Sequence, residues 1–183
     1  MKTLRFGFIV MLLLLLSSCL TVEKKKYVFE FTGKNSGKLT ITYYNIFSMM
    51  DDTADVSESD FQNLIDNYIN GSTIESYFPE ATNFKKRLYV EDGKLCGEVT
   101  MEFNSLEAVR LMQLGKNGPI VMDLNKTIDG ETYDSSNGTY GNPDYMNIVY
   151  WPSKVKKIEV VTRVSDFNPD NSISLVELFN KWK

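Results

Sequence analysis

The chain contains no histidine among its 183 residues. This absence excludes Ser-His-Asp and Cys-His nucleophile systems, imidazole zinc sites and the usual general base at neutral pH. Only two cysteines occur, Cys19 and Cys96, so a multi-thiolate metal site is excluded as well. Glu98 and Glu102 stand four residues apart on a predicted strand, which places them about 13 Å apart, too far for the usual pair of hydrolytic carboxylates. The sequence therefore predicts a protein that is not an enzyme.

Basic charge is scarce once the first 18 residues are set aside. They hold two of the 20 basic residues and none of the 24 acidic ones, so the remaining 165 residues carry a net charge of −6. A nucleic-acid partner would require a basic face, and this balance argues against one. A length of 165 residues suits one domain.

Only one long apolar run occurs, at the start of the chain. Lys2 and Arg5 precede eleven uncharged, mostly apolar residues (6–16), and two serines and Cys19 follow. This order of charged, apolar and small segments is typical of a secretory signal that is removed. The run is too short to span a bilayer, which takes about 20 helical residues. The sequence therefore predicts a cleaved signal peptide over residues 1–18.

The residues Leu16-Ser17-Ser18-Cys19 resemble the lipobox of bacterial lipoprotein precursors. The resemblance implies that the Cys19 thiol receives a diacylglycerol, that cleavage leaves Cys19 first, and that its amine is then acylated, for instance with palmitate. Several acyl chains hold a protein stably on a membrane, whereas one chain does so only marginally. Leu20 is not the aspartate that retains enteric lipoproteins in the inner membrane, so the outer membrane is favoured in a Gram-negative cell envelope. The alternative is an ordinary secretory peptide that happens to contain a cysteine.

Residues 19–26 are expected to be the lipidated cysteine and a tether. The seven residues after Cys19 reach at most about 25 Å when fully extended, so the domain would stand close to the bilayer. Lys24, Lys25 and Lys26 could contact anionic headgroups, and the alternative is a solvated linker. For Cys96, the sequence indicates a structural thiol, because no neighbouring base or cation would lower its pKa.

Alternating apolar residues predict two β-hairpins, one over residues 26–47 and one over 86–103. Asp92-Gly93 is a strong turn signal in the second, and it pairs Tyr89 with Cys96 and Arg87 with Glu98. Helical spacing and capping-box residues predict helices over residues 59–70, 104–114 and 174–182. Further strands are expected over 120–124, 145–151 and 155–164, with a long polar loop between 125 and 144.

The order of these elements predicts one α+β domain over residues 27–183. It would hold a mainly antiparallel sheet built from hairpins, with about three helices packed on one face. The layout, and residues 97–107 in particular, also resemble small envelope lipoproteins of uncharacterised function, a resemblance that implies no particular activity.

Residues 166–177 resemble the twelve-residue calcium loop of EF-hands. The oxygen-bearing positions of that loop fall on Asp166, Asn168, Asp170, Ser172, Ser174 and Glu177. Asn171 stands where the family has glycine, Pro169 restricts the loop, and a strand rather than a helix is expected before it. The competing interpretation is a helix start, because Ser174 and Glu177 have capping-box spacing. Calcium is the only cofactor that the sequence suggests.

Two function classes follow from these observations. The first is a non-enzymatic, membrane-tethered envelope domain that binds a protein partner or has a structural role. The second is a domain that binds a small ligand, a glycan or a lipid, through tyrosines of the long loop such as Tyr133, Tyr140 and Tyr145. An apolar pocket beside that loop would favour the second class.

Overall fold

The structure is a computed structural model that describes residues 19–50, 54–127, 131–141, 146–164 and 168–183. The expected signal peptide, Tyr145 and Asp166 lie outside these residues. Among the described helices, none is both long and apolar enough to cross a membrane.

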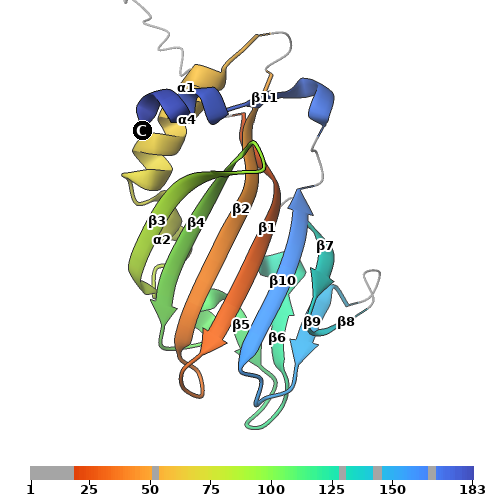
Figure 1. The fold of residues 1–183 in the computed structure, drawn as a ribbon. Coiled ribbons are helices and arrows are strands. Elements are labelled where there is room, and N and C mark those ends of the chain that lie inside the picture. Colours follow the sequence, from red (N-terminus) through yellow and green to blue (C-terminus); the bar gives the residue numbers. More distant parts are fainter. Residues whose placement is uncertain (1–18, 51–53, 128–130, 142–145, 165–167) are drawn as a thin grey trace, which may run out of the picture.

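A seven-stranded antiparallel sheet forms one layer of the fold (Figure 1). Its strands are β1 (Leu20–Phe31), β2 (Gly37–Met49), β3 (Thr82–Glu91), β4 (Lys94–Phe103), β7 (Glu131–Ser136), β10 (Lys157–Val164) and β11 (Ser172–Ser174). The order across the sheet is β3-β4-β2-β1-β10-β7. The short strand β11 pairs with residues 47–49 of β2, beyond the point where β4 stops pairing.

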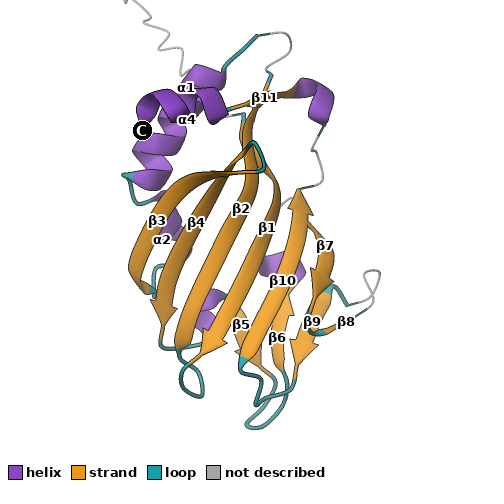
Figure 2. Ribbon diagram, in the orientation of Figure 1, coloured by secondary structure: helices purple, strands orange, loops and turns teal. Residues whose placement is uncertain are grey.

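A second, smaller sheet lies behind the lower half of the first (Figure 2). It consists of β5 (Leu111–Gln113), β6 (Ile120–Asp123), β8 (Thr139–Tyr140) and β9 (Ile148–Trp151), in the order β5-β6-β9-β8. Side chains of both sheets form the main core, with Phe29, Leu39 and Ile158 from the large sheet and Met122 and Trp151 from the small one.

Short helices complete the fold. They are α1 (Ser57–Asn63), the π-helical segment η1 (Leu64–Ile69), α2 (Thr73–Tyr77), the 3₁₀ turn η2 (Glu107–Val109), α3 (Leu124–Thr127), the 3₁₀ turn η3 (Pro169–Asn171) and α4 (Val176–Trp182). Helices α1 and α4 lie together at the end of the large sheet that holds β11 (Figure 1). A second core cluster fills this end, with Phe61 and Leu64 packed against Ile46, Leu175 and Phe179.

The expectation of a mainly antiparallel α+β fold is confirmed. The Asp92-Gly93 hairpin has the predicted register, with Tyr89 opposite Cys96 and Arg87 opposite Glu98. Both turn residues have positive φ, 50° and 72°, as a two-residue hairpin turn requires.

The predicted helix over residues 104–114 is wrong. Only Glu107–Val109 form a helical turn, Arg110 then adopts φ 60°, and Leu111–Gln113 continue as strand β5. Leu111 and Met112 pair with β6, so these residues help to build the second sheet where the sequence indicated a helix. The other two helices start two residues away from their expected caps, at Ser57 and at Val176.

The expected tether is wrong as well. Strand β1 begins at Leu20, and Leu20, Thr21 and Val22 already pair with β2. The three lysines do not form a free linker, and each has a different partner. Lys25 forms an ion pair with Glu131, Lys26 forms one with Glu159, and the Lys24 ammonium lies over the Tyr44 ring. Residues 20–26 therefore belong to the folded domain.

Strand β2 changes its inward face at Asn45. Ile41 and Ile46 both lie in core clusters, although strict alternation would put them on opposite faces of the sheet. Asn45 lies between them with φ 55°, a conformation that asparagine adopts more readily than most residues. Because of this switch, β2 contributes side chains to both the main core and the second core cluster. A cavity spans the region between the two clusters.

Candidate ligand-binding cavity

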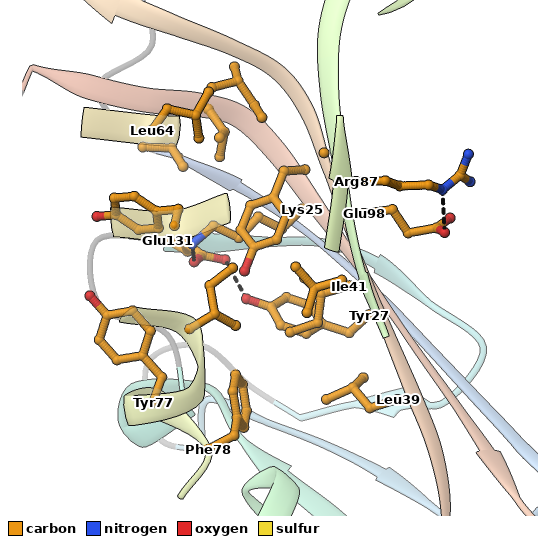
Figure 3. Close-up of a pocket in the computed structure, with 18 of the residues that line it drawn as sticks. Lys25, Tyr27, Leu39, Ile41, Leu64, Tyr77, Phe78, Arg87, Glu98 and Glu131 are labelled. Carbon is orange, nitrogen blue, oxygen red and sulfur yellow. Dashed lines mark hydrogen bonds and ion pairs between the residues drawn. The ribbon is translucent and has the colours of Figure 1, made fainter. Parts of the chain in front are cut away.

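A cavity of about 580 Å³ lies between the large sheet and the short helices (Figure 3). Its volume falls within the roughly 300–1,000 Å³ that is typical of small-molecule sites. Strands β1 and β2 supply one wall, through inward-facing residues such as Tyr27, Ile41 and Tyr43. Leu20, the first residue of β1, also lines it.

The opposite wall comes from η1, α2 and the residue that follows α2. Leu64, Tyr68 and Ile69 of η1 line the cavity, together with Ile74 and Phe78. The Asn70 amide donates to the Ile65 carbonyl, five residues back, which is the hydrogen bond of a π-helix. Such segments are rare and occur frequently at functional sites. This wall is thus short, irregular and predominantly apolar.

The polar part of the cavity is centred on Glu131. This carboxylate comes from β7, and its side chain is only 3% exposed. It accepts hydrogen bonds from the Lys25 ammonium, the Thr162 hydroxyl and, at 3.4 Å, the Tyr27 hydroxyl. Because a buried polar group is costly unless it is hydrogen-bonded, these three donors stabilise the Glu131 carboxylate and fix it in position.

Tyrosines surround this charge pair. Burial raises the pKa of Tyr27 well above its usual value, and the negative charge of Glu131 raises it further. Burial and Glu131 also raise the pKa of Tyr43, and the Lys25 ammonium lies 5.7 Å from the centre of the Tyr43 ring. Burial raises the pKa of Tyr68. All three side chains are therefore neutral hydrogen-bonding groups at physiological pH.

A second cation stands at the cavity beside α2. The Arg110 guanidinium lies 5.1 Å from the centre of the Phe78 ring and donates to the Tyr77 carbonyl at 3.1 Å. The ion pair Arg87–Glu98 also belongs to the lining of the cavity, at a distance from the Glu131–Lys25 pair (Figure 3). It forms at 2.8 Å, as the hairpin register predicts, with the Arg87 side chain 61% exposed and the Glu98 side chain 26% exposed.

The tyrosines suggested by the sequence are placed differently from those of the cavity. Tyr133 and Tyr140 stack on each other, with ring centroids 3.9 Å apart and planes at 10°, and both are partly buried against the main core. Tyr145 lies outside the described residues. Within the segment predicted as a polar loop, Glu131 of β7 lines the cavity. No local pattern indicates this residue, because its partner Lys25 is 106 residues away in the chain.

The residues of the calcium-like loop are only partly placed. Asp166 lies outside the described residues, and the Asn168 side chain accepts a hydrogen bond from the Asp170 amide. Ser172 and Ser174 belong to β11 and pair with β2. The Ser174 hydroxyl accepts from the Val176 amide at 3.4 Å, and Glu177 lies in the first turn of α4. In the described part of the chain, no three acidic or thiol side chains gather into a group that could hold a metal.

The two cysteines have different surroundings. Cys96 is buried, and burial raises the pKa of its thiol, which is consistent with the expected structural role. Cys19 is partly exposed and directly precedes β1.

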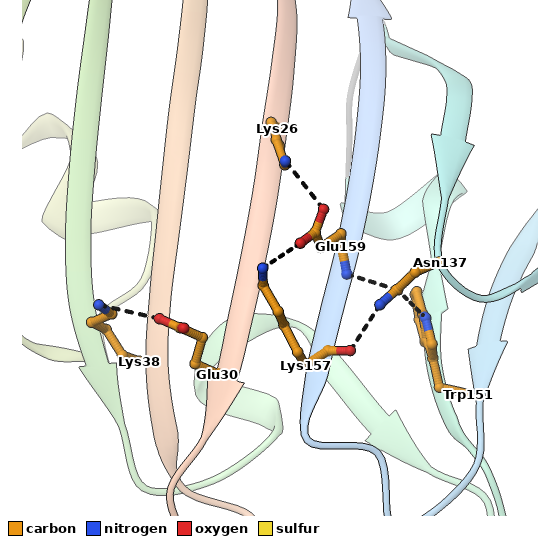
Figure 4. A network of polar contacts seen from close by, with 7 residues as sticks. All are labelled: Lys26, Glu30, Lys38, Asn137, Trp151, Lys157 and Glu159. Carbon is orange, nitrogen blue, oxygen red and sulfur yellow. Dashed lines mark hydrogen bonds and ion pairs between the residues drawn. The ribbon is translucent and has the colours of Figure 1, made fainter.

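Outside the cavity, Asn137 joins the two sheets (Figure 4). Its side-chain oxygen accepts from the Trp151 indole at 2.8 Å and from the Glu159 amide at 2.9 Å, and its amide group donates to the Lys157 carbonyl. Next to it, a Cβ on Gly138 would stand 2.4 Å from the Trp151 indole nitrogen, so only glycine fits. Asn137 and Gly138 together therefore hold the core tryptophan in position.

Comparison with known proteins does not place this chain in a family. No family model, no curated protein and no solved structure matches it.

Proposed function

We propose that the protein is a lipid-anchored cell-envelope domain that binds a small apolar ligand, of the acyl-chain class, and performs no chemistry on it. The observation that carries this proposal is the cavity of about 580 Å³, with aliphatic and tyrosine walls and one internally neutralised charge pair. A site of this kind binds through apolar contact, while a few fixed polar groups orient the ligand.

A lipid is favoured over a glycan by the chemistry of the walls. A glycan requires many hydrogen-bonding groups, whereas Leu64, Ile69 and Ile74 offer none from their side chains. Tyr133 and Tyr140 stack on each other, so one face of each ring is covered and these two tyrosines offer little surface on which a sugar could stack. The Arg110 cation, which also lines the cavity, would orient the anionic head of a fatty acid.

The anchor supports the same class of ligand. Lipidation of Cys19 would hold the domain at a membrane, and Leu20, the next residue, lines the cavity. Such a domain would take its ligand directly from the bilayer. In this proposal, η1 and α2 cover the same face of the large sheet that the small sheet covers further down.

The test is a fluorescence titration with dansyl-labelled undecanoic acid and competition by palmitate. Ile69→Trp places a large ring in the cavity, and the matched control Leu114→Trp places the same ring at an exposed position. We expect saturable binding that palmitate reverses, a loss of at least tenfold in affinity for Ile69→Trp, and none for Leu114→Trp. No saturable binding, or equal binding by both variants, would contradict the proposal.

A protein partner is the second candidate. Met112, Val121 and Tyr150 lie opposite one another across β5, β6 and β9, and Met112 and Tyr150 are 36% and 40% exposed. Crosslinking in intact cells would test whether these three residues contact a protein partner. A reproducible partner that is lost in the Met112→Lys, Tyr150→Lys double variant supports the candidate, and a partner retained by that variant contradicts it.

Calcium binding to the loop around Asp170 also remains a proposal. It is supported by the spacing of oxygen-bearing residues alone. Thermal melts in the presence of calcium and of a chelator test it, because a bound ion raises the melting midpoint. An unchanged midpoint would show that the segment is a helix start and not a calcium site.

A further inference from the structure

We infer that Asp60 is a docking site for the N-terminal residue of the mature chain, and that it fixes the lipid anchor so that the α1–α4 end of the domain rests on the bilayer. The inference rests on the proposed lipidation of Cys19, and it adds the geometry with which the anchored domain meets the membrane. It does not depend on the cavity ligand.

Asp60 is a buried carboxylate on α1, only 4% exposed. One of its oxygens accepts from the Cys19 amide at 3.2 Å, and the other accepts from the Ser48 hydroxyl at 2.6 Å. Ser48 is itself fully buried on β2, opposite Leu20. The carboxylate thus joins the residue that would carry the lipid to a buried residue near the end of β2.

The other main-chain group of Cys19 is held too. Its carbonyl accepts from the Met49 amide at 2.9 Å, and β1 pairing starts at the very next residue. No free segment therefore separates the lipidated residue from the sheet. After cleavage and N-acylation, the Cys19 nitrogen still carries one amide hydrogen, so the bond to Asp60 survives maturation unchanged.

The surface around this site has the chemistry of a membrane interface. Phe61, directly after Asp60, contacts Trp182 of α4 with ring centroids 6.5 Å apart. Trp182 is 49% exposed, and the exposed Lys181 and Lys183 flank it. Tryptophan is enriched at the headgroup level of bilayers, and lysines beside it can extend their ammonium groups to the phosphates.

Fluorescence quenching tests this orientation. The lipidated protein is placed in vesicles of phosphatidylcholine and phosphatidylglycerol, with or without bromine atoms on the acyl chains. Trp151 is 1% exposed in the core between the two sheets and serves as an internal reference, while Trp182→Phe reports emission without the surface tryptophan. We expect brominated lipid to remove the difference in emission between the wild type and Trp182→Phe.

Asp60→Ala tests the docking contact, with Asp66→Ala as the control at an exposed position just after α1. We expect Asp60→Ala to sediment with vesicles as the wild type does but to lose the quenching of Trp182, and Asp66→Ala to keep it. Wild-type-like quenching in Asp60→Ala would overturn the role of Asp60. If Asp60→Ala fails to fold, the wild-type measurement still decides the orientation.

Three outcomes show how this inference and the proposed function stand or fall. Equal Trp182 emission in brominated and plain vesicles, from protein that sediments with both, would overturn the orientation and leave the anchored, ligand-binding domain standing. A purified protein without acyl mass on Cys19 would overturn the anchor and this inference together. A failure of palmitate binding would leave the inference intact.

Discussion

At the scale of single residues, Glu131 is the feature on which the cavity depends most. It lies 106 residues from Lys25 and 31 from Thr162 along the chain, yet both donate to its carboxylate. No local sequence pattern indicates such a site, because Lys25 and Glu131 come together only when β1 and β7 pair with the two edges of β10. Hairpin register predicts the Arg87–Glu98 pair, whereas no local motif indicates Glu131.

Removal of the Glu131 carboxylate should be costly. Glu131→Ala leaves the Lys25 charge, Thr162 and Tyr27 without their acceptor inside the fold, and we expect a loss of about 3 kcal/mol in the free energy of unfolding. Glu98→Ala, which breaks the exposed pair with Arg87, should cost less than about 1 kcal/mol. Urea denaturation measures both, and similar losses would show that Glu131 is not a buried anchor of the cavity.

The cavity tyrosines predict a loss of stability at alkaline pH. Because folding raises the pKa of Tyr27 and Tyr43 above the ordinary value of 10.0, their contribution to stability is fully present below pH 10. As the pH rises further, the unfolded chain loses its phenol protons while the folded chain keeps them, so the free energy of unfolding falls.

Thermal melts between about pH 8 and 11 test this dependence in the wild type and in Tyr27→Phe and Tyr43→Phe. Each variant should show a smaller fall in melting temperature than the wild type over this range. A fall of the same size in all three proteins would mean that these phenols are not the groups that titrate.

At the scale of elements, hairpins were predictable and long-range pairings were not. Asp92-Gly93 fixes its own register, because a two-residue turn leaves only one pairing of the adjoining strands. The apolar residues between Leu106 and Leu114 fit helical spacing, but β6 offers Leu111 and Met112 a strand partner, and the left-handed Arg110 ends the helical turn. Residues 24–26 looked like a solvated linker because the partners of these lysines, on β2, β7 and β10, are remote in sequence.

The link between the two sheets should depend on Asn137. Asn137→Ala removes the acceptor of the buried Trp151 indole and two further hydrogen bonds, so we expect a loss of about 2 kcal/mol in the free energy of unfolding. Asn67→Ala, in an exposed helical pair with Asn63, should change stability by less than about 0.5 kcal/mol. Chemical denaturation of both variants checks this, and an Asn137→Ala protein as stable as the control would contradict the role of the side chain.

At the scale of the whole molecule, the fold combines a proposed membrane contact at one end with an internal apolar cavity. The cavity lining runs from Leu20, beside the expected lipidation site, to Met122 of the small sheet. An acyl chain from the bilayer would therefore need to travel only a short way to enter the protein.

The most direct test of this account is to locate a bound acyl chain by NMR. Isotope-filtered NOE spectra of the protein with palmitate should connect the methylene protons of the chain to the methyl groups of Ile41, Leu64 and Ile74, which line the cavity. The account predicts these contacts and their loss in Ile69→Trp. Contacts confined to exposed methyl groups such as those of Leu114, or none at all with palmitate in excess, would contradict it.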